Sequence, residues 1–287
     1  MQGSRRGLLK GVCALPLWSL SRDAGWVAGA IPPSPGLPDK SSFFVRGVYL
    51  DAAYTHPMSA VARSAYDEFL RQRATHDHRI GPGNNARNAA VEQFAGLIHA
   101  SPADVAVVPS TMEGENLVGQ SLGLNASAGV VTDALHYDAS LVMYGELARH
   151  GVPVSVVPAR EGSIDLADVE AVISKRTRLV AVSLVSNVTG FQYDLKSLCE
   201  LAHSRNALVY ADIIQAAGAV PVDVKSSGVD FCACGSYKWL MGDFGTAFLY
   251  VRPDRLPDLK RVQVGWRQIR YQAADSFPVE TRTDAEP

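Results

Sequence analysis

Two short segments contain the side chains with the clearest capacity for chemistry. Asp212 follows the apolar run 207–210, and Lys238 lies in a turn of small residues after a second apolar run, 229–234. A carboxylate can hold a ring nitrogen protonated, and a lysine can form an imine with an aldehyde. Pyridoxal phosphate (PLP) chemistry needs both groups, because the cofactor is the electron sink while the protein supplies the Schiff-base lysine and the pyridinium partner. The sequence therefore predicts a PLP site.

The neighbours of Lys238 favour this interpretation over an ordinary surface lysine. Gly235 and Ser236 precede it, and Trp239, Leu240 and Met241 follow it. Such small or apolar surroundings lower the pKa of an amine and favour imine formation. The hydroxyls of Ser236 and Tyr237, directly before the lysine, could hold a phosphate.

Asp212 and Gln215 allow two compatible interpretations. Their spacing is that of a helix N-cap with a capping box, and aspartate is common at such positions. A carboxylate at the end of a strand could equally keep a pyridinium protonated, with Gln215 hydrogen-bonded to the phenolic oxygen of the ring.

Three other segments place polar or aromatic groups after expected strands. Ser110 and Thr111 lie between a strand and a helix, where free amides and the helix dipole attract a phosphate, although capping alone also explains them. Asn187 could contact the ring oxygen or a substrate carboxylate, or could simply form a turn. His136 and Tyr137 follow another expected strand, and either ring could stack on a pyridine face or could simply be a surface aromatic of a loop.

The elements that must position these residues alternate regularly. Short apolar runs alternate with amphipathic segments, which predicts a three-layer α/β fold with a mostly parallel, doubly wound sheet. In such sheets ligands bind beyond the carboxyl ends of the strands. An additional short strand and turn is expected at 49–57, with helices from 59 to 74 and from the loop 81–85 to about residue 100. The later strands are expected at 105–108, 129–132, 152–157, 179–184, 207–210, 230–234 and 246–251, and the later helices at 113–122, 139–150, 166–174 and 195–204.

Composition excludes several function classes. The 287 residues are 47% hydrophobic and 20% charged, which suits a large core. A net charge of −2 gives no reason to expect nucleic acid or an anionic membrane as partner. No apolar run approaches the roughly 18 residues of a membrane span. No Gly-x-Gly-x-x-Gly follows the first strand, which argues against a nucleotide-binding Rossmann protein.

Cysteines and metal sites contribute little to the prediction. Cys232 and Cys234 stand two apart on an expected strand and share a face, which predicts small packing residues. With Cys13 and Cys199 they form neither a Cys-x-x-Cys metal pair nor a disulfide framework, and no metal site is predicted.

The N-terminus has the pattern of an export signal. Paired arginines, two leucines and a lysine at 4–10 precede a weak apolar stretch, 11–20, which is typical of the twin-arginine route. Small residues at 28–30 offer a cleavage site before a Pro-rich linker, 31–45. We therefore expect residues 1–30 to be a signal peptide and the protein to be exported to the periplasm, or cytoplasmic if the signal does not function.

Taken together, these segments resemble the class V aminotransferase family of fold-type I PLP enzymes, which includes cysteine desulfurases and isopenicillin N epimerase. The resemblance spans about residues 45–270 and rests on the segments 110–114, 185–190, 210–216, 235–238 and 242–246. It implies PLP as cofactor, an amino acid as substrate and aminotransferase, epimerase or lyase chemistry. The family is usually homodimeric, so a homodimer is expected.

The resemblance also implies a role for each site residue. Lys238 would be the Schiff-base lysine, Asp212 the pyridinium partner and Gln215 the contact to the ring oxygen. Asn187 would lie beside ring and substrate, and the phosphate would be held by Ser110, Thr111, Ser236 and Tyr237. Tyr137 would be the ring that stacks on the cofactor, with His136 as its alternative. Desulfurases have a histidine where this chain has Tyr237, which leans toward the epimerase-like or kynureninase-like members.

The resemblance also divides the chain. We expect a PLP-binding large domain at 46–265 and the start of a shortened C-terminal domain at 266–287. In the family that domain carries an arginine for the substrate carboxylate and, in desulfurases, a cysteine nucleophile. A chain with only the start of that domain would lack these groups, so the alternative expectation is a catalytically inactive PLP-fold remnant or a partner subunit.

Overall fold

A computed structural model describes residues 40–75, 85–265, 268–271 and 280–281. The chain divides into two units, Met1–Asp39 and Lys40–Pro287, and the second contains all the described residues. The predicted signal peptide, most of the Pro-rich linker, most of the loop 81–85 and most of the segment 266–287 lie outside them.

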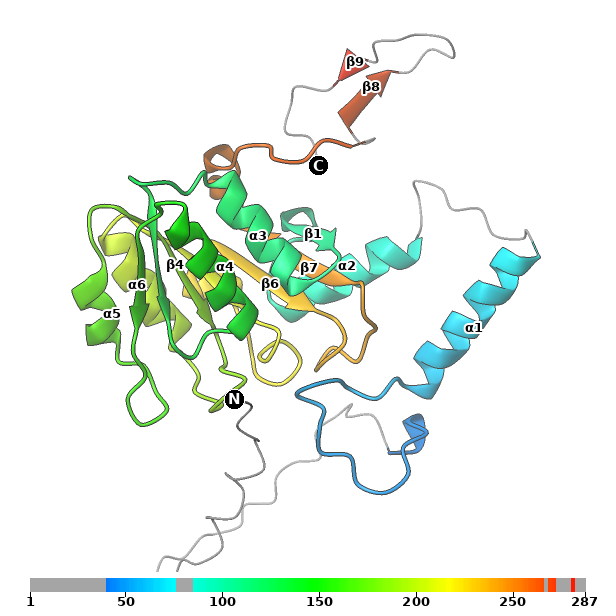
Figure 1. The fold of residues 1–287 in the computed structure, drawn as a ribbon. Coiled ribbons are helices and arrows are strands. Elements are labelled where there is room, and N and C mark those ends of the chain that lie inside the picture. Colours follow the sequence, from blue (N-terminus) through cyan, green and yellow to red (C-terminus); the bar gives the residue numbers. More distant parts are fainter. Residues whose placement is uncertain (1–39, 76–84, 266–267, 272–279, 282–287) are drawn as a thin grey trace, which may run out of the picture. The chain divides into compact units, whose positions relative to one another are not determined.

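The second unit is built on a seven-stranded sheet (Figure 1). The strand order is β1-β7-β6-β5-β4-β2-β3. β7 pairs antiparallel with β1 and β6, and the other neighbours are parallel. This confirms the predicted α/β fold with a mostly parallel sheet. The strands are β1 (Val105–Val108), β2 (Gly129–Asp133), β3 (Val154–Val157), β4 (Thr177–Ser183), β5 (Leu208–Asp212), β6 (Phe231–Gly235) and β7 (Ala247–Val251).

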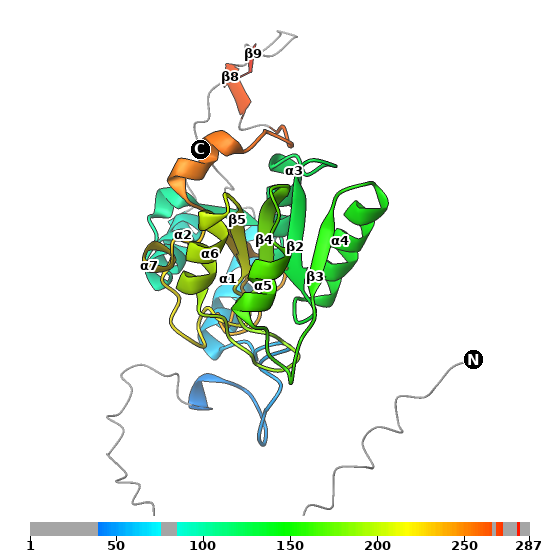
Figure 2. The same ribbon diagram turned by 90° about the vertical axis from the view of Figure 1, so that its left-hand side faces the viewer.

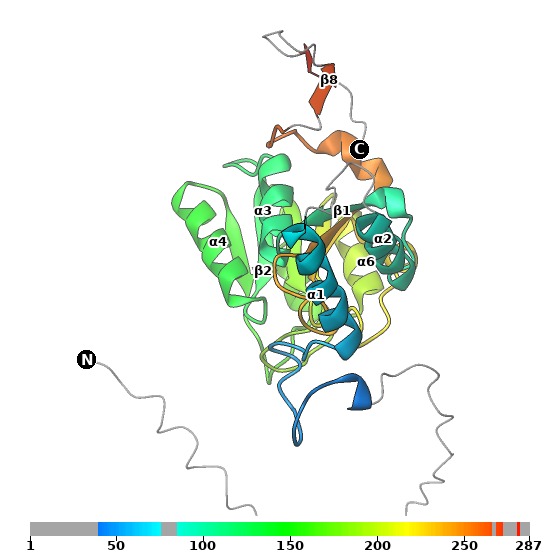
Figure 3. The same ribbon diagram turned by 90° about the vertical axis from the view of Figure 1, so that its right-hand side faces the viewer.

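Helices cover both faces of this sheet and bury an apolar cluster on each (Figures 2 and 3). One face packs against Val118 of α3 and Tyr144 of α4. The opposite face carries a larger cluster, in which Phe94 and Leu198 belong to helices α2 and α6. The helices are α2 (Asn85–Leu97), α3 (Thr111–Ser121), α4 (Asp138–Arg149), α5 (Leu166–Val172), α6 (Leu195–Ser204) and α7 (Val224–Ser227).

Side-chain caps fix the points at which helices begin. Ser110 accepts a hydrogen bond from the Glu113 amide at 3.0 Å and caps α3, and Asp194 caps α6 through the Ser197 amide at 3.2 Å. An N-cap side chain satisfies an amide that the helix cannot pair. The start of α3 is therefore held where the chain leaves β1.

The region before the sheet differs from the prediction. No strand forms at 49–57; instead residues 52–54 form a turn, closed by the Tyr49 hydroxyl, which donates to the Thr55 carbonyl at 2.6 Å. The backbone of this segment hydrogen-bonds to another loop and not to a strand: the His56 amide donates to the Tyr237 carbonyl at 2.9 Å. Helix α1 (Ala60–Ala74) follows as predicted, and none of its side chains is buried.

The remaining elements are short. Among the described residues, the 3₁₀ helices are η2 (Lys40–Ser42), η3 (Pro102–Asp104) and η4 (Pro253–Asp258), and β8 (Ile269–Tyr271) pairs antiparallel with β9 (Glu280–Thr281). Cys232 and Cys234 both lie in the larger core cluster, which confirms their packing role. In the described part of the chain, no helix has the length and apolarity needed to cross a membrane.

A glycine allows α3 to approach the sheet closely. A Cβ atom added at Gly114 would lie 2.9 Å from Cβ of Ala233 on β6, closer than two carbon atoms can pack. Helix α3 therefore owes its position, and that of its N-terminus, to the absence of a side chain at Gly114.

We expect Gly114→Ala to lower the free energy of unfolding by about 1–3 kcal/mol, because it overpacks the contact between α3 and β6. The matched control is Gly145→Ala on α4, where an added Cβ meets nothing within 4 Å. There the better helix propensity of alanine should raise stability by about 0.5–1 kcal/mol. Urea denaturation measures both, and stabilisation of the Gly114 variant would contradict the close packing.

Candidate active site

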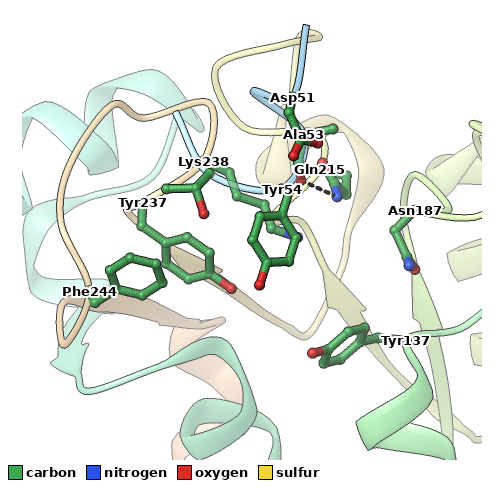
Figure 4. A pocket seen from close by; sticks show the side chains of 10 residues that line it. Asp51, Ala53, Tyr54, Tyr137, Asn187, Gln215, Tyr237, Lys238 and Phe244 are labelled. Atoms are coloured by element: carbon green, nitrogen blue, oxygen red, sulfur yellow. Dashed lines mark hydrogen bonds between the residues drawn. The ribbon is translucent and has the colours of Figure 1, made fainter. Parts of the chain in front are cut away.

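A cavity of about 410 Å³ lies beyond the carboxyl ends of the central strands (Figure 4). It brings together five residues that the sequence analysis singled out: Tyr137, Asn187, Gln215, Tyr237 and Lys238. They come from loops far apart in the chain, which the parallel strands deliver to one edge of the sheet. The other lining residues are Asp51, Ala53, Tyr54, Thr55 and Phe244.

Lys238 is the cationic side chain of this cavity and is 8% exposed. Burial lowers its pKa, while the charge of Asp212 opposes the shift. Within the described residues, no oxygen is placed to accept a hydrogen bond from Nζ, which lies 5.9 Å from the centroid of the Tyr237 ring. Among the described residues the amine thus contacts an aromatic ring but has no hydrogen-bond acceptor, which leaves its lone pair available for a nucleophile's role.

Asp212 ends β5 and is 3% exposed. Burial raises its pKa to about 6, although the Ile214 amide and the charges of His136 and Lys238 act in the opposite direction. The carboxylate accepts a hydrogen bond from the Ile214 amide at 2.9 Å. No helix follows, so the N-cap interpretation of Asp212 is wrong; the carboxylate closes a turn instead.

Gln215 joins three loops rather than forming a capping box. Its Nε2 donates to the Ala53 carbonyl at 2.9 Å, and its Oε1 accepts from the Trp239 indole at 2.9 Å. Figure 4 shows the first of these bonds at the edge of the cavity. Gln215 therefore fixes the segment around Ala53 and the turn after Lys238 relative to each other. A contact of Gln215 with a cofactor oxygen stays a prediction.

The predicted phosphate ligands lie at the start of α3 and in the turn after β6. Thr111, the first residue of α3, accepts a hydrogen bond from the Gly235 amide at 2.8 Å, which links the two segments. The Ser236 hydroxyl donates to the Asp243 carbonyl at 2.7 Å and still has a lone pair to offer. The amides of the first helical turn add positive potential at this point.

The two alternatives for the stacking ring occupy different environments. Tyr137 is 39% exposed and lines the cavity, whereas His136 is 1% exposed and does not line it. In Figure 4 the rings of Tyr137 and Tyr237 lie on different sides of the cavity, and Tyr237 stacks on Phe244 with centroids 4.5 Å apart. Asn187 lies in the turn after β4 and is exposed to the cavity.

Sequence reasoning missed a buried polar cluster around Glu115. This carboxylate contacts His136 Nε2 at 3.0 Å and accepts hydrogen bonds from the hydroxyls of Ser140 and Tyr144 at 2.6 and 2.7 Å. His136 Nδ1 lies 2.9 Å from the Ser183 hydroxyl. The one available signal was the position of Glu115 on the apolar side of α3, two residues after Glu113.

These residues fit PLP. A buried amine, a buried carboxylate at the end of the adjacent strand and a helix N-terminus match the aldehyde, ring nitrogen and phosphate of that cofactor.

Comparison with known proteins agrees with this geometry. The family model described as aminotransferase class-V matches residues 48–279. The chain belongs to the class V aminotransferase family. Its members are PLP-dependent, as predicted from the sequence.

Several relatives are named for particular activities. A probable cysteine desulfurase of Methanothermobacter thermautotrophicus is 30% identical over 239 residues, which are 81% of this chain and 60% of that protein. A cysteine desulfurase of Klebsiella pneumoniae is 36% identical over 77% of this chain and 57% of its own length. An uncharacterized aminotransferase of Bacillus subtilis is 34% identical over 75% of this chain and 56% of its own length. The chain thus spans under two thirds of these relatives.

A solved structure shows the same fold. The cysteine desulfurase CsdA of Escherichia coli superposes with a TM-score of 0.70 and 26% identity, over 83% of this chain and 62% of its own.

We expect Asp212→Asn to raise the free energy of unfolding of the ligand-free chain at about pH 8, because it removes a buried charge. One pKa unit corresponds to about 1.4 kcal/mol, so the gain should be about 1–3 kcal/mol. Because the folded-state pKa of about 6 lies above that of an unfolded aspartate, the wild type should regain this stability as the pH falls through 6 toward 4.

Urea denaturation at several pH values measures this difference. Asp165→Asn, which alters an exposed N-cap aspartate, controls for general effects of the substitution. Equal stability of wild type and Asp212→Asn at pH 8 would show that Asp212 is not a buried charge.

Proposed function

We propose that this chain binds PLP covalently through Lys238 and acts on an amino acid. The observation that supports the proposal most directly is the buried Lys238 amine, which lines the cavity, has no hydrogen-bond acceptor among the described residues and feels the charge of Asp212. A lysine buried without a hydrogen-bond acceptor costs stability, and perturbed groups of this kind cluster at functional sites.

The residues then have distinct tasks. PLP, when bound, supplies the electron sink for breaking bonds at Cα of an amino acid. The lowered pKa of Lys238 leaves more of its amine in the nucleophilic, unprotonated form. The same Nζ can take a proton from, or return one to, the substrate Cα. Asp212, once ionised, holds a proton at the ring nitrogen.

The start of α3 and the aromatic walls serve binding. Ser110 and Thr111 stand at the start of α3 and do not themselves line the cavity. The first amides of α3 and the helix dipole would stabilise a phosphate dianion bound at this helix end. Tyr137 offers a flat apolar surface for the pyridine ring, and Asn187 an amide for the ring oxygen or the substrate carboxylate.

The reaction type is aminotransfer, epimerisation or lyase chemistry. Several relatives are named cysteine desulfurases. The described cysteines Cys199, Cys232 and Cys234 are buried, none lines the cavity, and burial raises their pKa values. No thiol in the described part of the chain is therefore placed to attack a substrate sulfur.

Two further proposals concern assembly and location. A homodimer is supported by α1, where Val61, Tyr66 and Leu70 expose apolar surface. Export through the twin-arginine route is supported by the residue pattern at 4–10 and stays a prediction.

We expect Lys238→Ala to abolish the visible absorbance of PLP bound covalently to the protein, because no other lysine of the described segments lines the cavity. The control is Lys225→Ala, which removes an exposed lysine of α7 and should leave the spectrum unchanged. The measurement is an absorbance spectrum after removal of free PLP, with borohydride reduction and mass spectrometry to locate the modified residue.

The substrate test uses the same protein. Loaded wild type is incubated with a panel of amino acids in D₂O, and deuterium at Cα is measured by mass spectrometry. Exchange with at least one amino acid, lost in Lys238→Ala, is expected. Absence of covalent PLP in the wild type, or labelling equal in both variants, would overturn the proposal.

A further inference from the structure

Glu115 is a buried carboxylate that does not line the cavity, and its partners lead toward the cavity. It is 1% exposed and lies in the second turn of α3, on the side that packs against α4. Oε1 accepts from the Tyr144 hydroxyl at 2.7 Å and contacts His136 Nε2 at 3.0 Å, and Oε2 accepts from Ser140 at 2.6 Å. Both oxygens are thus fully engaged by groups of the β2–α4 segment.

Two of these partners flank Tyr137. His136 precedes it and Ser140 is the third residue of α4, for which Tyr137 is the N-cap. Tyr137 itself makes no side-chain cap hydrogen bond, so the start of α4 has no cap of the usual kind. The bonds from Glu115 to the residues on either side therefore restrain the turn that places the Tyr137 ring in the cavity.

The cluster is also electrostatically coupled to Asp212. Burial opposes a charge on His136, but the adjacent Glu115 carboxylate, together with Asp212 and Asp133, raises the pKa of the imidazole. Burial likewise opposes the Glu115 charge, yet His136, Ser140 and Tyr144 lower the pKa of Glu115 below its usual value. The titratable groups that face this pair from neighbouring elements are Asp133 of the β2 end, Tyr144 of α4, and Tyr210 and Asp212 of β5.

We propose that Glu115 is a positioning residue which, through a buried ion pair with His136 and a hydrogen bond from Ser140, fixes the turn that holds Tyr137 against the cofactor cavity. The inference that Glu115 and His136 form an ion pair does not depend on the proposed function. The effect of the ion pair on cofactor binding rests on the proposed function.

A purely structural explanation is weaker for a physical reason. A buried ion pair rarely adds stability over an apolar pair of the same volume, because desolvation offsets the attraction. The surrounding layer of Val118, Tyr144 and Leu179 is apolar and could accommodate such a pair. The cluster lies directly behind the one turn that joins β2 to the cavity wall.

The ion pair is tested first in the full chain without PLP. Proteins with ¹⁵N-labelled histidine are titrated between about pH 5.5 and 9, and the His136 signals are assigned by their loss in His136→Gln. In the wild type both ring nitrogens should stay protonated above the ordinary histidine pKa of about 6.5. In Glu115→Gln the ring should lose its proton at a lower pH than in the wild type, because only the Asp133 and Asp212 carboxylates then oppose burial.

The control for this titration is Glu146→Gln. Glu146 also lies beside a histidine, His150, at the C-terminal end of α4. His150 Nδ1 is 3.6 Å from the Glu146 carboxylate, but both side chains are exposed. This substitution should leave the His136 signals unchanged. A neutral His136 at about pH 7 in the wild type would overturn the ion pair.

The positioning role is tested by PLP affinity. Glu115→Gln should raise the PLP dissociation constant about tenfold, as expected for loss of one charge-assisted hydrogen bond. Tyr137→Ala should also weaken binding, and adding Glu115→Gln to it should change the constant less than about threefold, because the positioned ring is already gone. Multiplicative effects of the two substitutions would overturn the role.

A second variant, Ser140→Ala, tests the positioning role even if Glu115→Gln does not fold. Ser140→Ala removes one hydrogen bond to the carboxylate and keeps its charge, and should weaken PLP binding about threefold with Tyr137 present and not in its absence. Unchanged affinity in this variant would count against the role. If the wild type binds no PLP, the proposed function fails and the positioning role with it, while the histidine titration still decides the ion pair.

Discussion

The site depends on holding opposite charges in the protein interior at the ends of two adjacent strands. Asp212 ends β5, and Lys238 follows β6 by three residues; both are less than a tenth exposed. Each charge shifts the pKa of the other toward the ionised state, against the effect of burial. Burial without a full partner leaves an amine that can react and a carboxylate that titrates near neutrality.

The rest of the fold keeps these groups in place. Gln215 joins the turn after β5, the turn after β6 and the segment around Ala53 through two hydrogen bonds. Thr111 connects the start of α3 to β6, and Gly114 lets that helix lie close to the same strand. The polar groups of the cavity therefore belong to one rigid layer of loops above the sheet, which suits a site that must bind a cofactor in one orientation.

A second set of buried charges lies behind the cavity wall. Glu115 and His136 are both about 1% exposed and are linked to Asp212 electrostatically. The two buried pairs share the edge formed by the carboxyl ends of β2, β4 and β5, since Ser183 of β4 contacts His136. In a parallel sheet these ends meet, so charges placed there interact even when they are distant in sequence.

The fold class and the cofactor of the family could be predicted from the sequence alone. The alternation of apolar runs and amphipathic segments predicted strands within a few residues. Asp212 and Lys238 stood out because each follows a buried strand, where a charged group costs stability. The tertiary structure decided the rest. It separated Tyr137 from His136, gave Gln215 its partners in Ala53 and Trp239, replaced the expected first strand by a loop, and brought Glu115 to His136. These outcomes depend on which loops meet across the sheet, and local periodicity carries no information about contacts between residues that are distant in the chain.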